Sequence, residues 1–282
     1  MGRRREKPQR NGVARRDALG GRRDERRRCR QRFHGISPTA VVDDDTALTT
    51  AADDIAFRSR SIYLRGADAL VLADLHVGRG EASNVTLPVG ERRDLTSRLD
   101  ALLDATRPAT TVFAGDVLHR FGPVSERSRE TVAALRDCCA DAGSDPVFVR
   151  GNHDTALDTV CDDVRECYVV GGEPKTVVCH GHEEPPVAAD RYVIGHDHPA
   201  IEIEGRRRPC ALVAPDAHRG ADVVMVPAFS RLAPGVEIND ARADDLLSPL
   251  LDGLDDVRPV VYDDDRAEAL AFPPLSSFRR ML

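Results

Sequence analysis

Six short apolar runs recur along the chain from residue 69 onward, separated by polar stretches, some of which have helical spacing. Runs this short, rich in Val, Ile and Ala, are typical of buried strands. They cover residues 69–73, 111–114, 147–149, 176–179, 192–194 and 223–226. Residues 91–105 and 125–142 repeat Leu, Val and Ala at helical intervals between such runs. The alternation of strand and helix predicts an α/β domain.

The first 42 residues differ in composition from everything that follows. They carry 14 Lys or Arg and 4 Asp or Glu, a net charge of +10, whereas residues 43–282 carry −17. The arginine-rich segment 1–42 has no helical or strand periodicity, which is typical of disorder. Two interpretations stay open: a tail that neutralises nucleic-acid phosphates, or a start codon assigned too far upstream of Val41. We expect one folded domain over residues 55–282.

Residues 43–282 are rich in Asp, and Lys7 and Lys175 are the only lysines of the chain. This composition is typical of salt-accumulating archaea, where high salt screens carboxylate repulsion, although high genomic GC content would also favour Arg over Lys. The seven cysteines are irregularly spaced without a CxxC pair, which favours reduced thiols. No apolar run approaches the roughly 20 residues of a membrane span, and the basic start lacks a signal peptide's apolar segment. We therefore expect a halophilic, cytoplasmic protein.

Five short polar segments follow these predicted strands or lie beside them. They comprise 19 residues yet hold seven of the nine histidines. The carboxyl ends of strands are where α/β folds gather their ligands, so these segments predict one shared site. The segments are Asp74-Leu75-His76, Gly115-Asp116-Val117-Leu118-His119, Gly151-Asn152-His153-Asp154, His180-Gly181-His182 and Gly195-His196-Asp197-His198.

Each segment offers metal ligands. On an extended strand, Asp74 and His76 would point to the same side and could grip one ion. Asp116 follows a glycine at a strand end, and its two carboxylate oxygens could bridge two cations. Asn152 supplies a neutral carbonyl oxygen, which limits the negative charge near an anionic substrate.

His196 and His198 repeat the two-residue spacing, although a turn between them could send them to different ions. Nitrogen and oxygen ligands without thiolate suit Mn²⁺, Fe²⁺, Zn²⁺ or Co²⁺ better than Ca²⁺ or Mg²⁺. We take manganese as the first choice of cofactor.

The order DxH, GDxxH, GNHD, HG and GHDH resembles the calcineurin-like metallophosphoesterase superfamily over about residues 60–200. The sequences DLHVGRG, GDVLHRF, CHGHEEP, GHDHPAI and VPAFSRLAPG are similar, more narrowly, to the archaeal and bacterial group that includes the ligase-associated DNA-damage-response endonuclease. The resemblance implies a four-layer αββα sandwich, with two mixed sheets face to face and helices outside. It also implies a dinuclear metal site at the carboxyl ends of the strands.

The resemblance further implies which residues hold each ion. One ion would be bound by Asp74, His76, Asp116 and His198. The other would be bound by Asp116, Asn152, His180 and His196. In the fourth segment His182 is the alternative to His180, which we prefer because it directly ends the apolar run.

The family's catalytic histidine corresponds to His153. By resemblance it contacts the phosphoryl oxygens and protonates the leaving group, paired with the adjacent Asp154. Two-metal hydrolysis of this kind needs no protein nucleophile. His119 and Arg79, just past the ligand segments, are candidates for contacting substrate phosphate, since Arg suits bidentate phosphate recognition.

The expected function is therefore hydrolysis of phosphodiester bonds in nucleic acid or nucleotides. The alternative is a small-molecule phosphomonoesterase or a cyclic-nucleotide phosphodiesterase. A non-catalytic scaffold, which some relatives have become, is disfavoured because His153 is retained. The −17 charge of residues 43–282 argues against avid DNA binding. No membrane partner is expected, and the sequence does not predict an oligomeric state.

Overall fold

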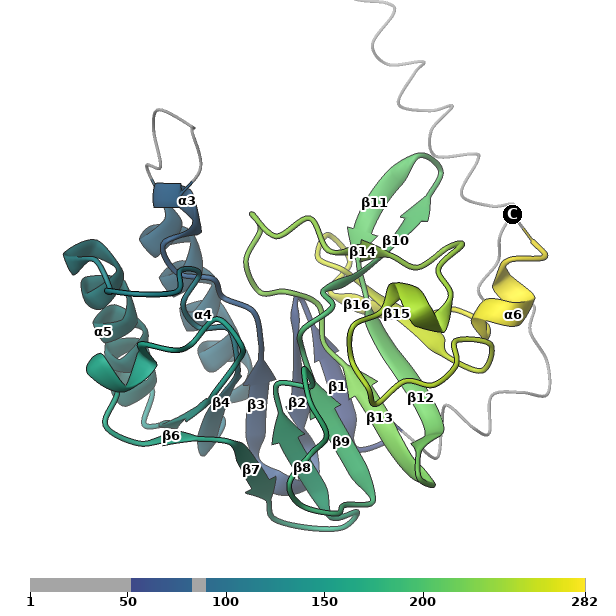
Figure 1. Ribbon diagram of the computed structural model, residues 1–282, viewed down its shortest axis with the longest axis horizontal. Helices are drawn as coiled ribbons and strands as arrows, with labels where there is room; N and C mark the ends of the chain where they lie inside the picture. The colour runs from purple at the N-terminus through teal and green to yellow at the C-terminus, as the bar shows by residue number, and fades with distance from the viewer. Residues whose placement is uncertain (1–51, 83–89, 282) are drawn as a thin grey trace, which may run out of the picture. The chain divides into compact units, whose positions relative to one another are not determined.

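Two large β-sheets lie face to face in the computed structural model, which describes residues 52–82 and 90–281 (Figure 1). The arginine-rich segment 1–42 lies outside the described residues. Within the described part, no helix has both the length and the apolar character needed to cross a bilayer.

The six-stranded sheet holds the first three predicted strands, and its order follows the sequence. Neighbours are antiparallel from β1 to β3 and parallel from β3 to β6. Its strands are β1 (Ile55–Arg58), β2 (Ser61–Leu64), β3 (Ala69–Leu72), β4 (Thr110–Ala114), β5 (Asp145–Val149) and β6 (Val164–Arg165). The short 3-10 helices η1 (Arg65–Ala67) and η2 (Leu157–Thr159) lie in the connections. Because β3, β4 and β5 are parallel, their carboxyl ends meet at one edge of the sheet.

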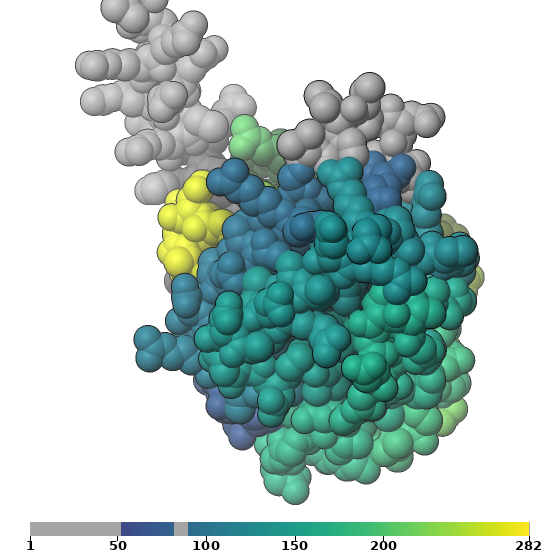
Figure 2. All heavy atoms as spheres, turned by 90° about the vertical axis from the view of Figure 1, so that its left-hand side faces the viewer, coloured from purple at the N-terminus to yellow at the C-terminus, as the bar shows by residue number. Residues whose placement is uncertain are grey.

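Two predicted helices cover the outer face of this sheet, at the left of Figure 1. Helix α4 (Glu91–Thr106) buries four leucines spaced to lie on one face. Helix α5 (Glu126–Asp141) begins after Ser125, whose side chain accepts a hydrogen bond from Ser128 N. Both pack into one apolar cluster with the sheet, and Figure 2 shows that blue to teal residues form much of this side. The short helix α3 (Arg79–Ala82) follows β3.

The seven-stranded sheet holds the other three predicted strands, β8, β9 and β13, as parallel neighbours. The remaining strand pairs are antiparallel. The order is β16 (Glu268–Ala271), β15 (Arg258–Asp263), β12 (Ala211–His218), β13 (Ala221–Met225), β9 (Arg191–Ile194), β8 (Thr176–Cys179) and β7 (Cys167–Val170). Valines and alanines from both sheets fill the space between them.

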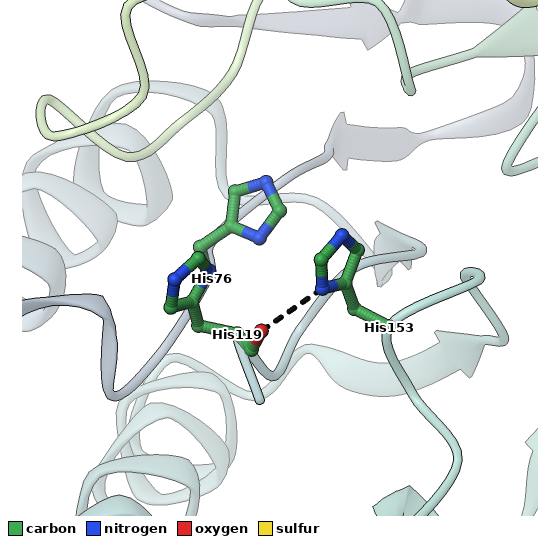
Figure 3. A group of neighbouring side chains, drawn as sticks. All are labelled: His76, His119 and His153. Atoms are coloured by element: carbon green, nitrogen blue, oxygen red, sulfur yellow. Dashed lines mark hydrogen bonds between the residues drawn. The ribbon is translucent and has the colours of Figure 1, made fainter. Parts of the chain in front are cut away.

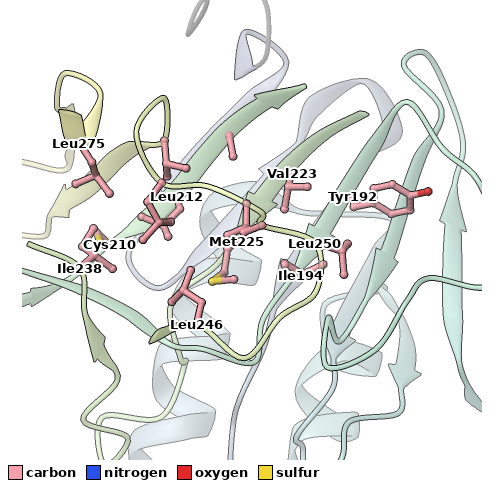
Figure 4. Packing of buried hydrophobic residues seen from close by; sticks show 14 of the residues in the cluster. Tyr192, Ile194, Cys210, Leu212, Val223, Met225, Ile238, Leu246, Leu250 and Leu275 are labelled. Atoms are coloured by element: carbon pink, nitrogen blue, oxygen red, sulfur yellow. The ribbon is translucent and has the colours of Figure 1, made fainter. Parts of the chain in front are cut away.

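The outer face of the seven-stranded sheet completes the four layers, and the predicted fold class is confirmed. This layer differs in detail from the other side, because short elements and loops take the place of long helices. They are the three-stranded sheet of β10 (Pro199–Ile203), β11 (Arg206–Pro209) and β14 (Val236–Glu237), with η3 (Ala243–Asp245) and α6 (Leu275–Phe278). Figure 4 shows Leu246, Leu250 and Leu275 packed against Leu212 and Met225 of the sheet.

Candidate metal centre

The five polar segments meet at the edge where the parallel strands of both sheets end. The segments after β3, β4 and β5 come from the six-stranded sheet, and those after β8 and β9 come from the seven-stranded sheet. A parallel bridge between Ala73 and Ala228 joins the two sheets at this edge. A second bridge, between Val77 and Leu118, holds the first two segments together.

Five of the seven predicted ligands have left-handed backbone, a conformation that is uncommon outside glycine. Asp74 and His76 therefore do not lie on the predicted extended strand: β3 ends at Leu72, and both residues lie in the loop that follows it. The loop nevertheless directs both side chains to the same site. The φ angles are 57° for Asp74, 48° for His76, 50° for Asp116, 77° for His196 and 51° for His198.

Glycines let these turns approach one another closely. A Cβ atom on Gly195 would lie 2.5 Å from Asp74 Oδ2, and one on Gly151 would lie 2.2 Å from Asp116 N. Side chains at these two positions would push apart the segments that carry the carboxylates. The glycines in the motifs are thus required by the packing of one segment on another.

Asp116 belongs to one group of candidate ligands and also faces another. Its Oδ1 atom is 3.4 Å from His180 Nε2 and accepts a hydrogen bond from His153 N at 2.9 Å. Its Oδ2 atom is 3.9 Å from His76 Nε2. One carboxylate oxygen therefore faces each group, which is the arrangement that a bridging ligand requires.

The first group is Asp74, His76 and His198, whose donor atoms lie within 4.8 Å of one another. His198 Nε2 is 3.1 Å from Asp74 Oδ1 and 3.2 Å from His76 Nε2. Asp74 Oδ1 and His76 Nδ1 are buried without a hydrogen-bond partner. An unpartnered buried carboxylate oxygen beside two imidazole nitrogens fits a cation, which would satisfy it.

The second group is Asp74, Asp116 and His180, again with donor atoms within 4.8 Å. His180 Nδ1 faces the carbonyl oxygen of Ala114 at 3.1 Å, and because a carbonyl only accepts, Nδ1 carries the hydrogen. In the neutral ring Nε2 is then an acceptor, yet it lies 3.0 Å from Asn152 Oδ1, another acceptor. Lone pairs that converge in this way fit a metal ion.

His196 lies beside the second group, with its ring centroid 5.0 Å from that of His180 and its backbone N–H donating to Asp74 Oδ2. The alternative ligand His182 is half-buried, 5.2 Å from His180 and 6.0 Å from His196 by ring centroids. Asp197 points away from the site and accepts hydrogen bonds from the backbone N–H groups of Leu247 and Ser248.

The buried charges favour neutral imidazoles and an added cation. Burial lowers the pKa of His76 and of His180 to about 3 in each case. Burial, together with the charge of Asp74, raises the pKa of Asp116 to about 8. For Asp74 itself burial opposes ionisation, but His198, His180 and His76 outweigh it and lower its pKa. A positive ion would relieve the repulsion between the two carboxylates.

His153 is positioned by a backbone carbonyl, as Figure 3 shows. Its Nδ1 atom lies 2.9 Å from His119 O, so Nδ1 carries a hydrogen and Nε2 is left on the side of Asp116 Oδ2, 3.9 Å away. The donor atoms of His76, His119 and His153 also lie within 4.8 Å of one another. This third group makes His119 and His153 candidate ligands as well, beside their predicted roles in substrate contact and proton donation.

Asp154 does not occupy the place that the sequence argument gave it. Its carboxylate is fully buried and accepts hydrogen bonds from the backbone N–H groups of Val117, Leu118 and Gly151. It therefore ties together the segments after β4 and β5, while the His119 carbonyl takes the expected position beside the His153 ring. Burial raises the pKa of Asp154 to about 6, although the three N–H donors oppose this shift.

Three further features support or surround the site. Arg60, which no sequence signal marked, donates hydrogen bonds to the carbonyls of Ala228 and Ser230. Ser230 N donates in turn to Asp74 O, which explains why the VPAFSRLAPG stretch accompanies the metal motifs. The pKa of His119 is lowered, mainly by burial and next by the positive charge of Arg79.

A family model and several solved structures match the chain. The model of the calcineurin-like phosphoesterase family matches residues 68–212, more than half of the chain. Among solved structures, nuclease MPE from Pseudomonas putida is 24% identical, with 76% of this chain and 91% of that chain covered and a TM-score of 0.49. YfcE, a phosphoesterase from E. coli, is 17% identical, with 73% and 98% covered and a TM-score of 0.38. No curated protein matches the chain.

Proposed function

The chain belongs to the calcineurin-like phosphoesterase family, which makes it a metal-dependent phosphoester hydrolase, and we propose that it cleaves phosphodiester bonds in nucleic acid or nucleotides. The narrower sequence likeness to the ligase-associated endonuclease group supports this choice of substrate. So do the cationic side chains of Arg79 and Arg120, whose charges act on His119 at the edge of the site.

The position of Asp116 carries the proposal. It stands between the two groups of ligands with one oxygen toward each, which supports two ions that share this carboxylate. We assign Asp74, His76, Asp116, Asn152, His180, His196 and His198 as ligands. When bound, two divalent cations supply Lewis acidity: they offset the charge of a phosphoryl group and make water more acidic.

The chain's own contribution to catalysis centres on His153. The His119 carbonyl holds its Nδ1–H, so Nε2 is directed toward the site and can give a proton to the leaving oxygen. In the doubly protonated ring this carbonyl still accepts from Nδ1, so the proton that is given is the one on Nε2. Arg79 and His119 would contact the phosphate that His153 protonates.

The donor set supports a borderline transition ion, manganese first and then iron, zinc or cobalt. All seven proposed ligands offer nitrogen or oxygen. Cys179, directly before His180, is buried, and burial raises the pKa of its thiol to about 12. Its sulfur is therefore protonated in the metal-free protein.

The deciding experiment combines metal analysis with a substrate panel. The purified protein should bind two Mn²⁺ ions, lose hydrolysis on chelation and regain it on adding Mn²⁺. A bis-aryl phosphate and short DNA should be cleaved faster than an aryl monophosphate. A preference for the monophosphate or for cyclic nucleotides would point to the alternative enzymes. Two bound metals without any hydrolysis would favour the scaffold.

Asp116→Asn provides the internal check on the bridging assignment. Because its two oxygens face His76 and His180, one in each group, this variant should lose metal from both sites and nearly all activity. Asp158→Asn is a matched control, since that exposed carboxylate pairs only with Arg150 at the surface. An Asp116→Asn protein with full metal content would contradict the proposed bridge.

A further inference from the structure

Phe121 is exposed to an unusual degree for an aromatic residue beside a buried site. Its exposed fraction is 63%, and it is the only aromatic among the large apolar side chains exposed in the described residues. It belongs to none of the three apolar clusters of residues 52–82 and 90–281. Folding thus leaves much of this ring in water, so its position is not explained by core packing.

One face of the Phe121 ring is covered by His153. The two ring centroids are 4.6 Å apart with an angle of 28° between the planes. The His119 ring is nearly parallel to that of His153 as well, at 5.8 Å and 10°. Because Phe121 has one face on His153 and remains 63% exposed, its other face is open to an incoming group.

The residues around the ring suit the two parts of a nucleotide. Arg120 lies between His119 and Phe121 in the chain, and the backbone N–H of Arg79 donates to the His76 carbonyl at 3.0 Å, so two cationic residues lie beside the histidines. Such charges attract phosphate, whereas the open face of an aromatic ring attracts a planar, apolar group. A nucleobase attached through a sugar to the reacting phosphate has both properties.

We propose that Phe121 is a specificity residue on which a nucleobase of the substrate stacks. The base would lie next to the phosphate whose leaving oxygen His153 protonates. This inference rests on the proposed phosphodiesterase function and extends it to the recognition of the base. Stacking of this kind tolerates any base, because every base has a π-face. A rival role is that Phe121 merely orients His153, in which case it would act on every substrate alike.

Binding tests the inference without turnover. The chain contains no tryptophan, so Phe121→Trp places a single fluorophore at the proposed platform. Adenosine monophosphate should quench its emission, whereas ribose 5-phosphate, which has the same phosphate without the base, should leave it unchanged. Equal responses to the two ligands, or no response to either, would overturn the proposal.

Kinetics separates stacking from the orientation of His153. The substrates are a dinucleotide and the same dinucleotide with both bases removed. Phe121→Ala and Phe121→Leu should each lower kcat/KM for the full dinucleotide by about tenfold or more, with the base-free substrate changed less than about twofold. Leu still covers His153 but cannot stack, so a rescue by Leu, or equal losses on both substrates, would overturn the proposal.

Val169→Ala is the matched control, since it truncates another exposed apolar side chain, on β7. It should leave both substrates unaffected. If the wild-type protein with Mn²⁺ cleaves neither dinucleotide, the proposed function fails, and the tryptophan titration still decides whether residue 121 recognises a base.

Discussion

Left-handed backbone at the ligands is the main feature of this molecule at the scale of single residues. Five non-glycine ligands share it, and each such residue costs on the order of 1–2 kcal/mol. Strain of this kind persists only where surrounding contacts fix it, here the Ala73–Ala228 bridge and the close approach of Gly195 to Asp74. The ligand positions are therefore set by the fold before any ion binds.

His153→Ala should separate chemistry from metal binding. The variant should keep both ions, because His153 is not among the proposed ligands, yet lose about 10²–10⁴-fold in kcat on a diester with an alkyl leaving group. With a nitrophenolate leaving group the loss should shrink, because that oxygen needs little protonation. Metal analysis and the two rates decide the matter, and equal losses on both substrates would contradict the role of proton donor.

The metal-free protein should become less stable as the pH rises from 7.5 to 8.5. Its Asp116 has a pKa raised from 3.8 to about 8, so the folded state holds a proton that the unfolded state has released. The contribution of Asp116 to stability is therefore fully present below pH 3.8 and is lost as the pH rises through 8. The slope should be at most about 1.4 kcal/mol per pH unit. His76 and His180, with a pKa lowered from 6.5 to about 3, oppose this slope near pH 6.5, because the unfolded chain still binds protons there. Above pH 7.5 both histidines are largely neutral in either state.

Denaturant unfolding of the chelated protein measures this slope directly. Saturating Mn²⁺ should remove it, because the bound form keeps Asp116 ionised. Asp116→Asn should also remove it, whether or not metal is present. A chelated wild-type protein whose stability is flat from pH 7.5 to 8.5 would contradict a protonated Asp116.

At the scale of elements, the strands and long helices could be predicted, because they follow from the periodicity of the sequence. The conformations of the loops between them could not, because they depend on tertiary contacts. All six apolar runs became strands, and the two long helices begin and end within a residue of their predicted limits. The loop that places Asp74 and His76 could not be predicted, since left-handed residues at 74 and 76 depend on the contacts of other segments. The hydrogen bonds of Asp154 could not be predicted for the same reason: its partners are backbone groups up to 37 residues away.

Asp154→Ala should destabilise the fold through the two segments that it joins. It leaves three buried N–H groups without an acceptor, for which we expect a loss of about 2–4 kcal/mol in the free energy of unfolding. Asp158→Ala, at an exposed pair with Arg150, should change stability by less than about 0.5 kcal/mol. Unchanged stability for Asp154→Ala, with an altered pH–rate profile, would instead support the original pairing with His153.

At the scale of the whole molecule, charge dominates: residues 43–282 carry −17 and one lysine. We expect repulsion among these carboxylates to extend across the domain at low ionic strength, because the Debye length is about 30 Å at 0.01 M salt. At 1 M it is about 3 Å, which confines repulsion to neighbours. The expected adaptation to salt therefore consists in the screening of this repulsion at high salt concentration.

The melting temperature and the turnover of a small diester should therefore both rise between low and molar KCl. Cleavage of long DNA should instead pass through a maximum, because salt weakens phosphate contacts while it stabilises the fold. The small diester is the control that separates these two effects. A melting temperature that is flat or falling with salt would show that the Asp-rich, Lys-poor composition reflects nucleotide bias.

The described chain passes from one large sheet to the other at a single residue, Glu166, between β6 and β7. Cleavage at that point would leave Asp74, His76, Asp116 and Asn152 on one fragment and His180, His196 and His198 on the other. Neither fragment alone would hold a complete set of ligands for either ion. The protein is thus a natural candidate for fragment complementation, in which Mn²⁺ would drive two separately expressed halves to reassemble and activity would report the metal concentration.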